Sequence, residues 1–238
     1  MKQIYLHKSP ASLSLTLLFG GWGSGAELFA DCRPKDSDLM LCYDYHDLDF
    51  DSSVLKGYST IRVVAWSMGV WAASRLFSEG AFEGVTVEMA TAFGGTVELA
   101  DDLCGIPEAI FEATVRGMSP AALKKFRRRM CGAFLQHFED HLPERSFEDL
   151  DGELKAVAAA LGRSSAEPSS EHPSQNPKDL PAGKPFWTSA VAGSGDLIFP
   201  VANQLNSWGK RGIPCRVIDA PHYCPEVFEK LTGGECFD

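Results

Sequence analysis

Three residues of this 238-residue chain carry side chains that could act together on an ester: Ser67, Asp196 and His222. A serine hydroxyl is a weak nucleophile at neutral pH, so it needs an imidazole that takes its proton. The imidazole in turn needs a carboxylate that fixes its tautomer and stabilises its positive charge. These residue types point to nucleophilic acyl transfer, provided that the fold brings the three side chains together.

The residues around Ser67 favour the role of nucleophile. The apolar segment 60–66 leads into this serine, and small and apolar residues that suit a helix follow it. The stretch AWSMG (65–69) is a variant of the G-x-S-x-G motif, in which a sharp strand-to-helix turn exposes the serine hydroxyl. The small residues on either side let the strand and the helix approach closely. The alternative is that Ser67 only caps the helix.

A glycine-rich segment, Gly20–Gly23, could complete such a site because it follows the apolar segment 13–19. Acyl transfer needs backbone N–H donors where negative charge develops on the carbonyl oxygen. Glycines let the backbone come close to a substrate. We expect the amides of Met68 and Trp22 to form this oxyanion hole. An ordinary glycine-rich turn is the alternative.

Asp196 and His222 each follow another strand-like segment, 186–193 and 214–220 respectively. The chain order serine, aspartate, histidine is the order expected of α/β-hydrolases. The other histidines lie on predicted helices, in a Pro/Ser-rich stretch, or after earlier strands. We therefore assign Ser67, Asp196 and His222 as a catalytic triad.

The elements that must position these residues are strands alternating with helices. Strands that are apolar along their whole length and joined by a helix predict a parallel sheet covered on both faces. In the first half we expect a helix at 68–80, where apolar residues recur at helical spacing and Gly80 can end it. The strand-like segments are 4–7, 13–19, 38–45, 60–66, 84–91, 186–193 and 214–220.

Between about 100 and 162 the pattern changes to helices, with apolar residues three and four positions apart. Ser119 followed by Pro120 is a favourable helix start, and 163–185 is rich in proline and serine. We expect an α/β-hydrolase fold, with a mostly parallel sheet, helices on both faces and a helical lid inserted before the last strands. The predicted parts are 1–99 (core), 100–185 (lid and connection) and 186–238 (core).

Composition excludes several classes of function. A formal net charge of −10 argues against general nucleic-acid binding. No run of 18 apolar residues predicts a membrane span, and the N-terminus lacks an apolar leader. Seven cysteines, scattered and without a CxxC pair, favour reduced thiols in a cytoplasm and give little support for a zinc site. We expect a cytoplasmic protein without a metal or cofactor.

Five cations in the hexapeptide KKFRRR (124–129) stand out against this acidic background. Such a cluster suggests an acidic partner, and a solvated helix face is the alternative. Successive residues on a helix point in different directions, so not all five can face one partner. Residues four apart share a face. The candidate partner-binding residues are Lys124, Lys125, Arg127, Arg128 and Arg129.

With these residues in place, the chain resembles the BioG-type pimeloyl-[acyl-carrier protein] methyl ester esterases of biotin synthesis, within the α/β-hydrolase superfamily. The resemblance covers nearly the whole chain, except that 163–185 matches nothing recognisable. Ala65, in place of the superfamily's first glycine, is expected in this group. The matching features are the Gly20–Gly23 loop, AWSMGVWAA, the run DDLCGIP (101–107), KKFRRRMC, and the surroundings of Asp196 and His222.

The resemblance implies hydrolysis of the methyl ester of pimeloyl-acyl carrier protein, which releases methanol and ends chain elongation. It also implies that the acidic carrier protein is the partner of the basic cluster, and that an apolar channel under the lid holds the acyl chain. Two alternatives stay open. One is a general carboxylesterase or thioesterase with the same triad, and the other is a hydrolase-fold binding protein without activity.

Overall fold

The computed structural model describes residues 1–9, 12–162 and 186–237. A seven-stranded sheet, in the order β1-β3-β2-β4-β5-β6-β7, runs through the molecule. All neighbouring strands are parallel except the edge pair β1 and β3. The strands are β1 (Lys2–His7), β2 (Ser14–Phe19), β3 (Asp38–Tyr43), β4 (Thr60–Trp66), β5 (Thr86–Phe93), β6 (Ser189–Gly195) and β7 (Cys215–Pro221).

The central strands are apolar on both sides because helices and loops cover both faces of the sheet. Leu15, Leu17 and Leu18 of β2 are fully buried, although neighbouring side chains of a strand point to opposite faces. In a sheet with one face exposed to solvent, buried and exposed side chains alternate along each strand. Burial of every side chain is typical of a parallel sheet with both faces covered. The predicted fold class, α/β with a mostly parallel sheet, is confirmed.

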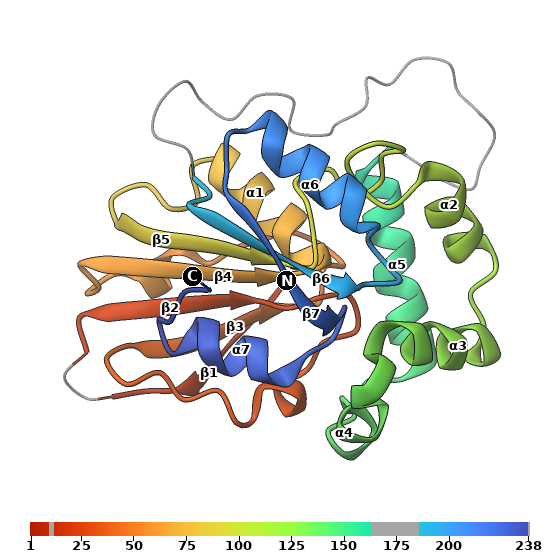
Figure 1. Cartoon of the computed structure of the whole chain (residues 1–238). Helices are drawn as coiled ribbons and strands as arrows, with labels where there is room; N and C mark the ends of the chain where they lie inside the picture. The colour runs from red at the N-terminus through yellow and green to blue at the C-terminus, as the bar shows by residue number, and fades with distance from the viewer. Residues whose placement is uncertain (10–11, 163–185, 238) are drawn as a thin grey trace.

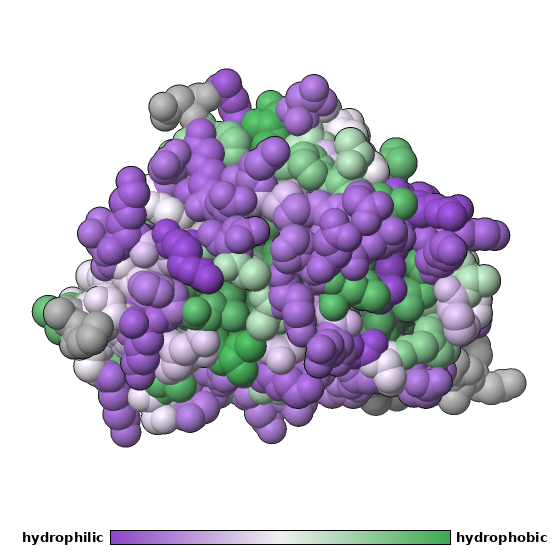
Figure 2. Space-filling view, turned by 90° about the horizontal axis from the view of Figure 1, so that it is seen from below, coloured by the Kyte–Doolittle hydropathy of each residue, from purple (hydrophilic) through white to green (hydrophobic). Residues whose placement is uncertain are grey.

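Three helices flank the sheet (Figure 1): α1 and α6 lie on one face and α7 lies on the other. No helix among the described residues is long and apolar enough to cross a bilayer. Seen from the side of α4 and α7, hydrophilic residues cover most of the surface, and apolar residues show in recesses between them (Figure 2). These helices are α1 (Met68–Ser78), α6 (Val201–Lys210) and α7 (Pro225–Thr232).

Four helices between β5 and β6, which we call the lid, gather at the end of the sheet to which the strand arrows point (Figure 1). The carboxyl ends of all the parallel strands lie there, so the lid stands over the edge where α/β proteins bind ligands. The segment 163–185, predicted as a connection, lies outside the described residues. The lid helices are α2 (Glu108–Arg116), α3 (Pro120–Cys131), α4 (Leu135–Asp140) and α5 (Phe147–Ala160).

Local sequence explains where α3 begins and ends. The Ser119 hydroxyl accepts a hydrogen bond from the amide of Ala122 at 3.2 Å, and Pro120 occupies the first helical turn, as predicted. The helix that begins at Pro120 does not continue to Asp140, however. Gly132 has a φ of +51°, in the left-handed region, and there α3 gives way to a short 3₁₀ turn before α4.

Candidate active site

Ser67 occupies a strained turn between β4 and α1. Its φ of 58° and ψ of −125° are unusual for a residue with a side chain. A Cβ at Gly69 would come within 2.4 Å of the carbonyl oxygen of Phe19, so only glycine allows α1 to begin this close to β2. The Ser67 hydroxyl does not cap the helix. The cap alternative raised by the sequence is therefore wrong.

His222 follows β7 and joins Ser67 to Asp196. Its Nε2 lies 2.9 Å from the Oγ of Ser67, and its Nδ1 lies 2.8 Å from Oδ2 of Asp196. The side chain of His222 is 1% exposed and that of Asp196 is 0% exposed, so water scarcely competes for the second bond. The structure thus brings the three predicted residues together, although Ser67, Asp196 and His222 directly follow three different strands, β4, β6 and β7.

Four hydrogen bonds hold the Asp196 carboxylate. Oδ1 accepts from the amides of Ile198 and Phe199 at 2.8 and 2.9 Å, and Oδ2 accepts from Gln204 Nε2 at 3.0 Å as well as from His222. These donors leave the carboxylate little freedom to rotate. The imidazole therefore meets an acceptor in a fixed position, with its proton held on Nδ1 and its Nε2 lone pair directed at the serine.

Aromatic side chains fix the plane of the His222 ring. Phe199 stacks on it at 5.9 Å with an interplanar angle of 6°. The Trp66 ring lies 5.5 Å from the His222 ring at a tilt of 44°, and the Trp66 indole N–H donates to the His222 carbonyl at 2.8 Å. Trp66 also contacts Phe228 of α7 edge to face. The residue before the serine thereby holds the segment that carries the histidine.

The glycine loop after β2 passes directly beside Ser67. A Cβ at Gly21 would lie 3.1 Å from the Cβ of the serine. Within the described residues, the backbone N–H groups of Trp22 and Met68 have no acceptor, although both residues line the cavity that holds Ser67. Unpaired amides beside a hydroxyl nucleophile are what an oxyanion site requires.

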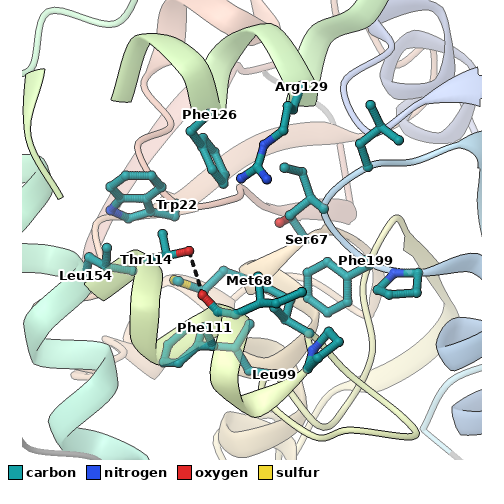
Figure 3. Close-up of a pocket in the computed structure, with 16 residues that line it drawn as sticks. Trp22, Ser67, Met68, Leu99, Phe111, Thr114, Phe126, Arg129, Leu154 and Phe199 are labelled. Carbon is teal, nitrogen blue, oxygen red and sulfur yellow. Dashed lines mark hydrogen bonds between the residues drawn. The ribbon is translucent and has the colours of Figure 1, made fainter. Parts of the chain in front are cut away.

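An apolar cavity of about 130 Å³ opens above Ser67, between the sheet edge and the lid. Phe111 of α2 and Phe126 of α3 line it, whereas Phe138 of α4 lines a smaller neighbouring cavity. In Figure 3 the Thr114 hydroxyl turns back to its own helix, where it donates to the Ile110 carbonyl at 2.8 Å. That bond satisfies the hydroxyl within α2.

The five basic residues of α3 divide between two environments. Arg129 lines the cavity, and Figure 3 shows its side chain reaching from α3 toward the space above Ser67. The guanidinium of Arg127 lies over the Phe138 ring, at 5.6 Å from its centre. The remaining three, Lys124, Lys125 and Arg128, are exposed and form no ion pair with any described residue.

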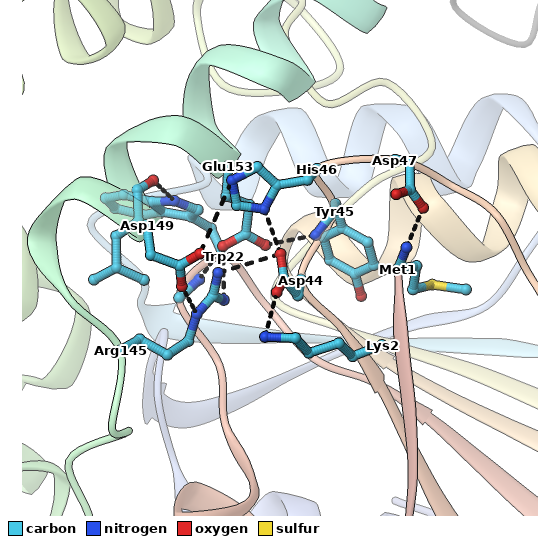
Figure 4. A network of polar contacts seen from close by, with 12 residues as sticks. Met1, Lys2, Trp22, Asp44, Tyr45, His46, Asp47, Arg145, Asp149 and Glu153 are labelled. Atoms are coloured by element: carbon cyan, nitrogen blue, oxygen red, sulfur yellow. Dashed lines mark hydrogen bonds and ion pairs between the residues drawn. The ribbon is translucent and has the colours of Figure 1, made fainter.

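A buried ionic network under the glycine loop was not predicted from the sequence (Figure 4). The Glu153 carboxylate, on α5, accepts from the amides of Gly23 at 3.2 Å and Tyr45 at 2.9 Å. Arg145 pairs with it at 2.9 Å. The indole N–H of Trp22 donates to the Leu150 carbonyl at 2.9 Å. The lid is therefore fastened to the loop that carries the candidate oxyanion amide.

Opposing effects set the charges in this network. Burial raises the pKa of Glu153, while Arg145 and the two backbone donors counteract that rise. Burial would also raise the pKa of Asp44, but hydrogen bonds from Lys2 and His46, together with Arg145, outweigh it and lower that pKa to about 2. No local motif could have revealed the role of Glu153, because the two backbone amides that it accepts from, those of Gly23 and Tyr45, lie more than a hundred residues earlier in the chain.

The fold and this site define an α/β-hydrolase. A lipase-esterase related protein from Clostridium acetobutylicum has the same fold, with a TM-score of 0.59 at 12% identity over 98% of this chain and 96% of that one. The family model described as Pimeloyl-ACP methyl esterase BioG matches residues 1–235. The chain belongs to the BioG family, as the sequence resemblance indicated.

One solved structure supports the family assignment, and a longer relative matches this chain over part of its own length. The crystal structure of BioG from Haemophilus influenzae is similar with a TM-score of 0.76 and 34% identity, covering 96% of this chain and 97% of that one. A malonyl-[acyl-carrier protein] O-methyltransferase of Bacteroides fragilis is 38% identical over 93% of this chain and 42% of its own length. This chain therefore spans about two fifths of that methyltransferase.

Proposed function

We propose that this protein is a serine esterase that hydrolyses the methyl ester of pimeloyl-acyl carrier protein, yielding pimeloyl-acyl carrier protein and methanol in biotin synthesis. The hydrogen-bonded chain from Ser67 through His222 to Asp196 carries the proposal, within a family described as methyl esterases. The methyl-transferring activity in the name of the Bacteroides fragilis relative is not proposed for this chain.

In the first half of the reaction, His222 Nε2 takes the hydroxyl proton as Ser67 Oγ attacks the ester carbonyl carbon. The resulting oxyanion accepts hydrogen bonds from the amides of Trp22 and Met68. Asp196 stabilises the imidazolium. His222 then gives its proton to the methoxy oxygen, the C–O bond breaks, methanol leaves, and a pimeloyl ester of Ser67 remains.

In the second half, water replaces methanol. His222 takes a proton from the water as the hydroxide attacks the acyl carbon, and the same two amides hold the second oxyanion. The proton returns from His222 to Ser67 Oγ as the acyl–oxygen bond breaks. The products are free serine and the carboxylic acid.

The cavity suits an acyl chain of this length. Its volume of about 130 Å³ is close to that of apolar protein cavities of roughly 150 Å³ that hold benzene. A chain of several methylene groups therefore fits beside Phe111 and Phe126. Burying such a chain contributes about 0.8 kcal/mol for each methylene group, which favours a medium-length acyl group over acetate.

The charge of α3 supports binding of an acidic carrier protein at the mouth of this cavity. Lys124, Lys125 and Arg128 offer exposed cations without competing ion pairs among the described residues. Arg129 lies closer to the ester and Arg127 rests on Phe138, so we assign carrier-protein contact mainly to the other three. Complementary charge accelerates encounter and fixes orientation more than it adds affinity.

Comparison of two substrates tests the proposal against a general esterase. The ratio of kcat/KM for methyl pimeloyl-acyl carrier protein to that for methyl butyrate, which has the same leaving group, should be at least about 100, because the carrier protein and the longer chain both add binding energy. Equal values for the two substrates would favour the general esterase. Absence of activity on both, in folded protein, would favour a binding protein.

A genetic test addresses the physiological role. Expression of the wild-type protein in a bacterial host that lacks its own pimeloyl methyl esterase should restore growth without biotin. Expression of Ser67→Ala at the same level should not. The wild-type protein could fail to restore growth although it is soluble and active on the carrier-protein substrate in vitro. That result would support the esterase activity and contradict the role in biotin synthesis.

A further inference from the structure

Two histidines and an aspartate outside the active site meet where the lid touches the core. His137 and His141 lie one helical turn apart, with their rings stacked at 4.3 Å and 18°. Asp31 comes from the loop after a 3₁₀ turn, Ala26–Phe29, in the core. One ligand atom from each of the three residues lies within 4.8 Å of the other two.

The hydrogen bonds of both rings are those expected of metal-ligating histidines. His141 Nδ1 is 2.9 Å from the backbone carbonyl of His137, so this nitrogen is the donor and Nε2 carries the lone pair. His137 Nδ1 lies 3.1 Å from the Tyr223 hydroxyl. Metal-binding histidines characteristically use their second nitrogen in this way, which fixes the ring and its tautomer. In the described part of the chain, neither Nε2 has a partner.

A second cluster, Asp44, His46 and Asp149, also has ligand atoms within 4.8 Å of one another, but positively charged side chains already pair with it. Lys2 and Arg145 both pair with Asp44, and Arg145 also pairs with Asp149. A metal ion would have to displace those positive charges. The cluster at Asp31 contains no such ion pair within the described residues, and its carboxylate is exposed.

We propose that Asp31, His137 and His141 bind one zinc-type divalent ion, with water as the fourth ligand. Ligand atoms around tetrahedral zinc lie about 3.3 Å apart, given Zn–N distances near 2.0 Å. The three ligand atoms lie within 4.8 Å of one another, so the two stacked rings must turn for their nitrogens to face one ion. Imidazole and carboxylate are ligands that zinc prefers. Cysteine spacing gives no sign of this site, because its ligands are two histidines and an aspartate.

The ion joins the lid to the core beside the active site. His137 and His141 belong to α4 and its C-terminal end, while Asp31 belongs to the core. Tyr223, the outer partner of His137, directly follows His222, and its amide donates to the carbonyl of Met130 on α3 at 2.9 Å. Bound metal therefore stabilises the packing of α4 against the segment after β7.

Calorimetric titration of zinc chloride into EDTA-treated protein tests the site. We expect one ion per chain and a melting temperature that rises with zinc concentration. Asp31→Asn and His141→Gln should each weaken zinc binding by at least 10-fold, because even loss of an outer-shell partner costs about 10- to 100-fold. Neither substitution should change hydrolysis of a small ester in the absence of metal.

Control variants identify where an ion binds. His7→Gln, which changes a histidine of β1, and His46→Gln, in the second cluster, should leave zinc affinity unchanged. The proposal is overturned if the wild type shows no saturable zinc binding, or if His141→Gln binds zinc as tightly as the wild type. Binding that disappears only in Cys236→Ser would place the ion at an exposed thiol and would also overturn it.

Discussion

The carboxylate of Glu153, on a lid helix, accepts a hydrogen bond from the backbone amide of Gly23, next to the candidate oxyanion residue, at 3.2 Å. Glu153 is fully buried, and Arg145 neutralises it. Because the same carboxylate also accepts from Tyr45, one side chain of the lid holds the loops after β2 and β3. The position of the Trp22 amide therefore depends on the lid.

Glu153→Gln should lower kcat for a small ester by about 10- to 100-fold with little change in KM. A glutamine can accept only one of the two amide bonds, so the glycine loop shifts. The loss should be smaller than the 10²- to 10³-fold cost of removing an oxyanion donor outright. Steady-state kinetics on folded protein, compared with wild type, measure this split between kcat and KM.

Glu148→Gln is a matched control because it makes the same chemical change at an exposed position of the same helix. It should leave kcat unchanged. Glu153→Gln should also lower the free energy of unfolding by up to about 3–5 kcal/mol, the usual cost of breaking a buried ion pair. A loss of stability with wild-type kcat would assign Glu153 a structural role alone.

Asp196→Asn should reduce kcat by about 10⁴-fold while the protein stays folded. An asparagine amide that donates toward Nδ1 places the imidazole proton on Nε2, so the ring cannot accept from Ser67. Ser194→Ala removes an exposed hydroxyl two residues away and is the control. Activity of Asp196→Asn within 10-fold of wild type would show that this carboxylate does not orient the base.

The strands and the triad could be predicted from the sequence because their signals are local. Apolar runs mark β2 and β4, and the motif AWSMG together with chain order marks Ser67 and its partners. Strand ends differ from the predicted segments by a few residues. For example, the segment predicted at 186–193 forms a strand only from Ser189, because apolar runs continue into buried loops.

Long-range features could not be predicted in this way. Helix α7 was not predicted, although Pro225 in its first turn was an available signal. In the sequence, nothing distinguishes Glu153 from the other acidic residues of its helix. Only the tertiary fold brings it to Gly23 and Tyr45. The same holds for Asp31, which lies far from His137 in the sequence. A single sequence carries no record of such pairings.

Charge reversal on α3 should weaken carrier-protein binding selectively. In a triple variant of Lys124, Lys125 and Arg128 to Glu, KM for methyl pimeloyl-acyl carrier protein should rise about 10-fold or more, because each exposed pair contributes roughly 0.2–1 kcal/mol and repulsion adds to the loss. KM for p-nitrophenyl butyrate should stay constant. The preference of the wild-type protein for the carrier-protein substrate over the small ester should also diminish as salt is added, because salt screens exposed charges.

Lys56→Glu is the control for that variant because this exposed lysine precedes β4, at the opposite edge of the sheet from the lid. It changes net charge without touching α3. A similar rise in KM for Lys56→Glu would attribute the effect to overall charge. An unchanged KM in the triple variant would remove α3 from the binding surface.

Asp44 should make stability depend on pH at acid values. Its folded pKa of about 2 lies below the ordinary value of 3.8, so the unfolded chain binds a proton first as pH falls. The stabilisation by Asp44 is therefore complete above about pH 4 and is lost between about pH 4 and 2. Urea unfolding of wild type and Asp44→Asn should give a stability difference that shrinks in this range. A difference independent of pH would contradict the assignment.

Intact-mass analysis after treatment with a fluorophosphonate tests most directly whether Ser67, His222 and Asp196 form a working site. We predict one label per chain on wild-type protein, mapped to Ser67 by peptide mass spectrometry, no label on Ser67→Ala, and labelling slowed by several orders of magnitude in His222→Ala. Folded wild-type protein that takes up no label, or takes it up at another serine, would contradict the account.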